Sequence, residues 1–416
     1  MRFTKQIYRA KEYIRAFLGI DFLPQKFSNF LWVHIGFLLL TSVINLLANT
    51  LFPKIIKNEA VVLFFHAVVS ALTPLGTILS MFLLKHTSFS SNSKISFILF
   101  AILQIIFLFL VHFQNPLFLP LIAILNALAN GFYWVTYSLF ITKHITNSQR
   151  NRSVSIIGML SGFITIVVPL FSGFVISIFQ SLSGYIIVIL FSIVVIFFVL
   201  NRSQNLSKNP ISPEQTQFKR ATRLVFSNKI WYTCSITEFL KGLREGPFSF
   251  YLSLLLFSII RKESIISINM FAMGVVTAIS NKLYGQNRKM NDFKYMAVAT
   301  HALTFMTILF LIKPGVITVL ALGLSNAFFN LYIVNPVMKS FYFLANASQN
   351  GKLLTPELFS IRSCFLAAGR VLGIFLIFSV SKLTHGIPIA MLLLTLAQYV
   401  TLLLCKKTLS NFNNSN

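Results

Sequence analysis

The stretch "ISFILFAILQIIFLFLVHF", residues 95–113, contains no Asp, Glu, Lys or Arg. A membrane-spanning helix needs about 20 consecutive apolar residues, because the hydrocarbon core is about 30 Å thick and a helix rises about 1.5 Å per residue. A helix also satisfies its backbone polar groups within its own hydrogen-bonded turns. This stretch meets that requirement, and eleven similar runs flank it. We therefore predict further spanning helices at residues 30–52, 60–84, 118–142, 154–178, 184–200, 230–260, 265–284, 295–312, 315–344, 358–382 and 387–405.

The composition supports the same conclusion. The chain has 416 residues, of which 56% are hydrophobic and only 11% are charged, whereas soluble domains carry about 25% charged residues. This excludes a soluble enzyme, a disordered protein and a disulfide scaffold. We predict an all-α polytopic membrane protein with 12 transmembrane helices in two six-helix bundles. The cysteines, Cys234, Cys364 and Cys405, lie in or beside apolar runs, so we predict no disulfide framework, no metal site and no cofactor.

Basic residues set the expected orientation. The chain has 35 Lys+Arg against 9 Asp+Glu, an excess that would suggest nucleic acid in a soluble protein. With the N-terminus inside, 26 basic residues fall on the inner side and six on the outer side, leaving Lys241, Arg244 and Arg370 within helices. The positive-inside rule then predicts a multi-pass protein of the cell membrane with both termini cytoplasmic. Nucleic acid is not an expected partner, and we expect a monomer.

Polar segments divide the chain. Residues 1–29 form a basic amphipathic segment suited to an anionic inner leaflet. The polar stretch 201–229 is predicted to be a cytoplasmic linker between bundles at 30–200 and 230–405, and residues 406–416 form a cytoplasmic tail. A duplicated unit is suggested because "NALANGFYW" (126–134) can be aligned with "LGLSNAFFN" (322–330).

Polar stripes on helical faces predict which helices line a central cavity. They favour the runs at 30–52, 60–84, 118–142, 230–260, 315–344 and 358–382, while those at 95–113, 184–200, 295–312 and 387–405 should face lipid. Stripes of small residues predict that runs 154–178 and 265–284 serve as packing helices. The candidate substrate contacts on these stripes are Asn45, Asn49, Asn130, Tyr133, Asn326 and Asn330. The alternative for the Asn residues is hydrogen bonding between helices, and for Tyr133 it is aromatic packing.

The segment "TEFLKGLREGPFSFY", residues 237–251, places charges at mid-membrane. Glu238, Lys241 and Glu245 share a helical face, so Lys241 can pair with either acid, whereas Arg244 points elsewhere and needs another partner. Pro247 should kink or loosen the helix. Arg370 should meet Glu245 or Glu238, because an unpaired cation at that depth costs at least about 2.5–3.5 kcal/mol. The cluster is interpreted either as a static network or as a site for an anionic substrate or protons.

Twelve helices in two halves, joined by a basic loop, resemble the major facilitator superfamily over about residues 28–405. The superfamily's signature after the second helix is degraded, with Ser80 where its Asp would stand after Gly76. The segments "NGFYW" and "GLREGPFSF" look like those of bacterial members from low-GC Gram-positive species. The resemblance implies transport of a small solute by alternating access.

From the charges we expect proton coupling through Glu238 or Glu245 and an anionic or amphiphilic substrate, with import and efflux both open. The alternative is a lipid or glycolipid flippase of the same fold. A membrane-embedded enzyme or a non-transporting scaffold is less favoured, because no metal-ligand pair, His-Glu-x-x-His run or nucleophile elbow occurs.

Overall fold

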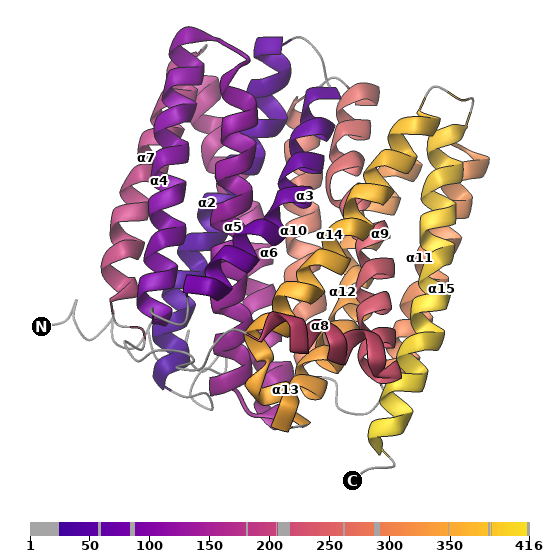
Figure 1. The fold of residues 1–416 in the computed structure, drawn as a ribbon. Helices are drawn as coiled ribbons and strands as arrows, with labels where there is room; N and C mark the ends of the chain where they lie inside the picture. Colours follow the sequence, from indigo (N-terminus) through magenta and orange to yellow (C-terminus); the bar gives the residue numbers. More distant parts are fainter. Residues whose placement is uncertain are drawn as a thin grey trace, which may run out of the picture.

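Long helices running side by side dominate the computed structural model (Figure 1). It describes residues 25–413 apart from gaps at 57–59, 84–87, 180–181, 205, 207–216, 261–262, 287–291, 348, 382 and 384. Each predicted run corresponds to one long helix, namely α2 (Gln25–Ile56), α3 (Ala60–Leu83), α4 (Phe89–Phe113), α5 (Phe118–His144), α6 (Asn147–Ile178), α7 (Leu182–Ser203), α9 (Lys229–Ile260), α10 (Glu263–Gln286), α11 (Asp292–Ile312), α12 (Val316–Ala347), α14 (Thr355–Val380) and α15 (Gly386–Asn413).

Within the described residues, ten helices are long and apolar enough to cross a membrane, so the chain is a multi-pass membrane protein. α9 is not among the ten, although it is as long as α2, and it carries the charges of the segment 237–251. We call α2–α7 the N-terminal half and α9–α15 the C-terminal half. The end of the bundle where α2 begins and α15 ends, at the bottom of Figure 1, is the terminal side.

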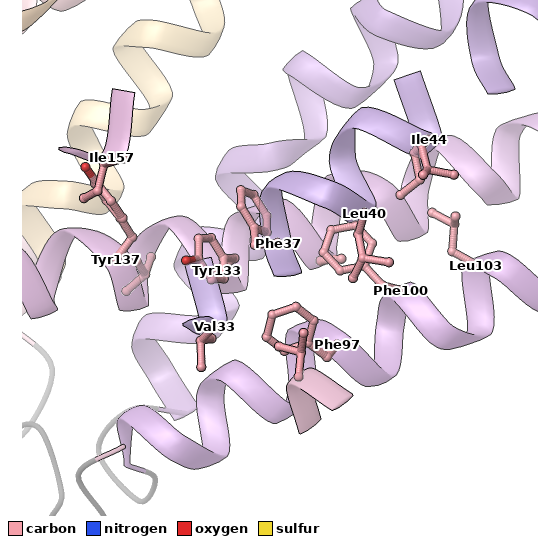
Figure 2. Close-up of a cluster of buried hydrophobic side chains, with 14 of the residues drawn as sticks. Val33, Phe37, Leu40, Ile44, Phe97, Phe100, Leu103, Tyr133, Tyr137 and Ile157 are labelled. Carbon is pink, nitrogen blue, oxygen red and sulfur yellow. The ribbon is translucent and has the colours of Figure 1, made fainter. Parts of the chain in front are cut away.

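Aromatic side chains fill the core of the N-terminal half. Phe37 of α2 stacks on Tyr133 of α5, with ring centroids 3.6 Å apart, and Phe97 and Phe100 of α4 close the same cluster (Figure 2). These rings are buried, and offset or edge contacts between them add to the burial of apolar area. Phe341 of α12 belongs to the same continuous core, so the core of the N-terminal half extends into the C-terminal half.

The two halves meet along two helix pairs, α6 with α10 and α3 with α14. A methyl group added at Gly162 would lie 2.8 Å from Ala278 N and 2.9 Å from Gly274 O, so the backbones of α6 and α10 are in direct contact. The predicted role of small residues in packing these two helices is therefore confirmed. Ser155 also donates a hydrogen bond across this contact to the carbonyl of Asn281.

The halves are sealed together on the terminal side. Every residue of α14 from Thr355 to Arg362 is buried, and partial exposure begins at Ser363. Ser360 Oγ donates to Thr77 O of α3 (3.3 Å), and Asn346 Nδ2 donates to Thr142 O of α5 (3.5 Å). Both bonds join the two halves, so the terminal side is closed in this conformation.

Peripheral helices expose apolar stripes. On α4 the exposed side chains recur at steps of three or four, as expected for one face of a helix against hydrocarbon. They are Ile98, Ile102, Ile105, Phe109 and Phe113. Similar exposed apolar side chains lie on α7, α11 and α15, and also on α3, α6 and α14. Exposure alone therefore does not separate the four predicted lipid-facing helices from the others.

The polar stretch 201–229 differs from a plain linker. Its second part forms a short helix, α8 (Phe218–Ser227), and a further short helix, α13 (Gln349–Leu353), precedes α14. The linker prediction overlooked α8 because its ten residues are too few to show a long apolar run. The predicted amphipathic segment at the N-terminus lies mainly outside the described residues, since α2 begins at Gln25.

Candidate functional site

The carboxylate of Glu238 is the centre of the most buried charge cluster. It is 2.5 Å from Lys241 Nζ, one turn along α9, and 2.6 Å from Arg362 Nε of α14. Its side chain is fully buried. A carboxylate in this position is stabilised only because both cations contact it directly.

Arg362 is a member of the cluster that the sequence reasoning missed. The charge count assigned it to the loop before α14, but the structure places it inside that helix, and its guanidinium lies over the rings of Phe341 (5.4 Å) and Tyr342 (5.9 Å) of α12. The available signal was its position near the start of the predicted run 358–382, but a basic side chain so close to a helix end can also reach the membrane surface. Arg362 thus joins α9, α12 and α14 near the closed terminal side.

The second ion pair lies farther along the same two helices. Arg370 Nη2 of α14 is 3.2 Å from Glu245 Oε2 of α9, so the prediction that Arg370 meets one of these two acids is confirmed. The side chains of Arg370 and Glu245 are 31% and 22% exposed, unlike that of Glu238. The two ion pairs therefore differ in accessibility, with the buried one nearer the terminal side.

Arg244 is partnered by amides. Its Nη1 donates to Asn330 Oδ1 (2.8 Å) and its Nη2 donates to Asn326 Oδ1 (2.5 Å), both on α12. The guanidinium carbon lies 4.5 Å from the ring centroid of Phe248. The prediction that Arg244 needs a partner other than Glu245 is confirmed, and the two Asn candidates of α12 supply it.

Glycines bring α9 and α14 into backbone contact beside the Glu245–Arg370 pair. A methyl group at Gly246 would lie 3.0 Å from Arg370 Cα, and one at Gly373 would collide with the carbonyl of Leu243. That carbonyl is the one that Pro247, which has no N–H, leaves without its helical donor. Close approach of Gly373 offers it a weak Cα–H donor instead.

α9 continues as a helix through Pro247, so the kink or loosening that we predicted there does not end the helix.

The candidates of the N-terminal half do not join this cluster. Tyr133 is buried in the aromatic core, with its hydroxyl oxygen 2.7 Å from His34 Nδ1. Asn130 donates to the side chain and carbonyl of Asn126 within its own helix (2.8 Å).

Two further candidates lie on α2. Asn49 Oδ1 accepts a hydrogen bond from His66 Nε2 of α3 (3.3 Å), so this side chain links two helices of one half. Asn45 is exposed. Among the described residues, no group of three or more His, Cys, Asp or Glu is placed to hold a metal ion.

Comparisons with known proteins agree with this architecture. The sequence profile of the Major Facilitator Superfamily matches residues 33–352. No curated protein sequence matches the chain.

Among solved structures, the chain is similar to the E. coli fucose:proton symporter FucP, with a TM-score of 0.67 and 14% identity over 90% of this chain and 97% of the symporter. It is also similar to a bacterial homologue of the iron transporter ferroportin in an outward-facing state, with a TM-score of 0.72 and 15% identity over 93% of this chain and all of that one. For the human organic anion transporter MFSD10 the TM-score is 0.66, with 16% identity over 92% of this chain and 100% of the transporter. At these identities the likeness concerns the fold.

Proposed function

The chain belongs to the major facilitator superfamily, and from this premise we propose that it moves a small anionic solute by proton-coupled alternating access of its two halves. It is a membrane transporter and not an enzyme. The substrate class and the coupling ion are the new elements of the proposal.

The single observation behind an anionic substrate is the environment of Arg244. This guanidinium is buried, yet its described partners, two amide oxygens and the ring of Phe248, carry no charge. Burying a cation against neutral groups is costly, whereas a carboxylate or phosphate in the same place would form charge-assisted, bidentate hydrogen bonds. The surrounding balance points the same way, since Lys241, Arg244, Arg362 and Arg370 outnumber the two acids.

Proton coupling is assigned to the pair of Glu245 and Arg370. Their partial exposure allows a proton to reach the carboxylate, which the full burial of Glu238 opposes. Protonation of Glu245 would release Arg370, and the freed guanidinium could bind the substrate anion or allow the helices to move. Glu238 then has a different role, holding α9 to α14 whichever way the transporter faces.

The closed terminal side supports alternating access. In this mechanism the contacts of α3 with α14 and of α6 with α10 would alternate between a closed and an open arrangement. If the termini lie in the cytoplasm of a cell-membrane protein, as the positive-inside rule predicts, this conformation is closed to the cytoplasm. Transport would then require the bonds from Ser360 to Thr77 and from Asn346 to Thr142 to open in each cycle.

A thermal-shift screen across pH tests the anion site. Purified protein is melted with organic carboxylates, phosphate esters, neutral sugars, organic cations and lipids. We expect stabilisation by anions, lost in Arg244→Ala and weakened in Asn326→Ala. Lys339→Ala is the matched control, because it removes a cation whose partner, Asp292, lies outside the cluster.

Hits are then tested for uptake into vesicles with an imposed pH gradient. Equal stabilisation by neutral or cationic compounds, or anion binding that survives Arg244→Ala, would contradict the assignment. Movement of a labelled lipid between leaflets, with no solute uptake, would instead favour a flippase.

A further inference from the structure

The helix α8 differs in orientation from the helices around it. In Figure 1 it lies across the terminal side of the C-terminal half, whereas the long helices run along the bundle. Ala221 and Val225 on one face are buried, while Lys219, Arg220 and Arg223 are exposed. α8 is therefore an amphipathic helix with a basic outer face.

An aromatic residue lies on that same outer face. On a helical wheel at 100° per residue, Phe226 has Lys219 and Arg223 on one side and the half-buried Thr222 on the other. Its side chain is 60% exposed. Its ring is 6.1 Å from that of Tyr232 and 6.2 Å from that of Phe365. An exposed Phe beside cations is unfavourable in water but suits the boundary between headgroups and acyl chains.

Two cations of the basic face, Lys219 and Arg223, form no ion pair with a carboxylate in the described part of the chain, and α8 itself contains no acidic residue. Arg220 donates to the neutral amide oxygen of Gln217 (2.9 Å). The surface is thus complementary to a row of anions.

Both ends of α8 are held by the bundle. The backbone N–H of Gln217 donates to Glu357 Oε1 at the start of α14 (3.0 Å). At the other end, Asn228 Oδ1 accepts from the N–H of Ile230 and so begins α9 (2.9 Å). The basic face is therefore presented in a fixed orientation, which lowers the entropic cost of binding.

We propose that α8 binds the headgroups of anionic phospholipids in the leaflet on the terminal side and anchors the C-terminal half to that surface. The cations meet the phosphates while Phe226 inserts among the upper acyl chains. This surface is separate from the charge cluster of α9 and α14, so the inference does not depend on the proposed function.

The test uses the full chain in vesicles of defined composition. Phe226→Trp is introduced after the three native Trp residues are replaced by Phe, and its fluorescence is quenched with brominated phosphatidylglycerol or brominated phosphatidylcholine. A basic residue near an anionic surface gains about fivefold in local lipid affinity, so we expect several-fold stronger quenching by phosphatidylglycerol.

That preference should disappear in K219Q/R220Q/R223Q and at high salt. The matched control, K26Q/K352Q/K406Q, removes as many cations from the terminal side and should keep the preference, and inorganic phosphate should not compete. Equal quenching by both lipids, loss of the preference in both triple variants, or no quenching by either lipid would overturn the proposal.

Discussion

Glu238 is the residue whose neutralisation tests the charge cluster most directly. The substitution Glu238→Gln keeps the size of the side chain but removes its charge and replaces one acceptor oxygen by an NH2 donor. Lys241 and Arg362, which both contact this carboxylate, would then be left as buried cations without it. The variant isolates the ionic contribution from packing.

The expected loss is large because the site is fully buried. Removing one partner of a buried ion pair lowers the free energy of unfolding by about 3–5 kcal/mol. Lys241 can lose its proton when its acid is removed, but Arg362 cannot. The double variant Glu238→Gln/Arg362→Gln should therefore regain up to about 3 kcal/mol relative to the sum of the single changes.

The assay is a double-mutant cycle of thermal melts and denaturant titrations in one detergent. Glu245→Gln is the internal reference, because the exposure of Glu245 and Arg370 limits its expected cost to about 1 kcal/mol. A Glu238→Gln protein as stable as the wild type, or a double variant whose loss of stability equals the sum of the losses in Glu238→Gln and Arg362→Gln, would refute the reasoning.

Three other predictions concern transport and packing. Glu245→Gln should abolish uptake driven by a pH gradient but keep substrate exchange without a gradient, as measured in vesicles; gradient-driven uptake at the wild-type rate would remove Glu245 from coupling. Arg244→Lys should weaken binding of the transported anion about tenfold, because an ammonium group cannot form the bidentate contact; isothermal titration measures this, and unchanged affinity would count against it. Gly162→Leu should lower both the melting temperature and the transport rate, because the side chain would enter the backbone of α10 near Ala278. Gly173→Ala, whose methyl group meets no atom within 4 Å, should alter neither, and equal effects of the two substitutions would contradict the packing argument.

The pairing of Arg370 was predictable from its cost. A cation in the middle of an apolar run needs an acid, and the chain offers few buried acids, so Glu245 and Glu238 were the expected partners. Arg362 follows the same logic but lies only two turns into α14. Near a helix end a basic side chain can reach the membrane surface, so position along the chain does not distinguish a loop cation from a buried one.

The polar stripes of the N-terminal half were less informative. A helical wheel shows that Asn130 and Tyr133 lie on a related face, but not which atoms meet them. In the structure Asn130 bonds within α5 and Tyr133 packs under Phe37. The same periodicity on α12 leads to Arg244 instead, because that face is turned towards α9.

By itself, the amino-acid sequence determined that this is a membrane protein of twelve long helices with charges that must be shielded from lipid. These properties follow from the transfer cost of each side chain into hydrocarbon, which depends on local composition. Only the tertiary structure decided that Glu238 joins Arg362 and that the terminal side is closed. Such contacts depend on how two helices that are distant in the sequence are rotated and how closely they approach. The close approach of α9 and α14 occurs where glycines such as Gly246 and Gly373 meet the neighbouring backbone.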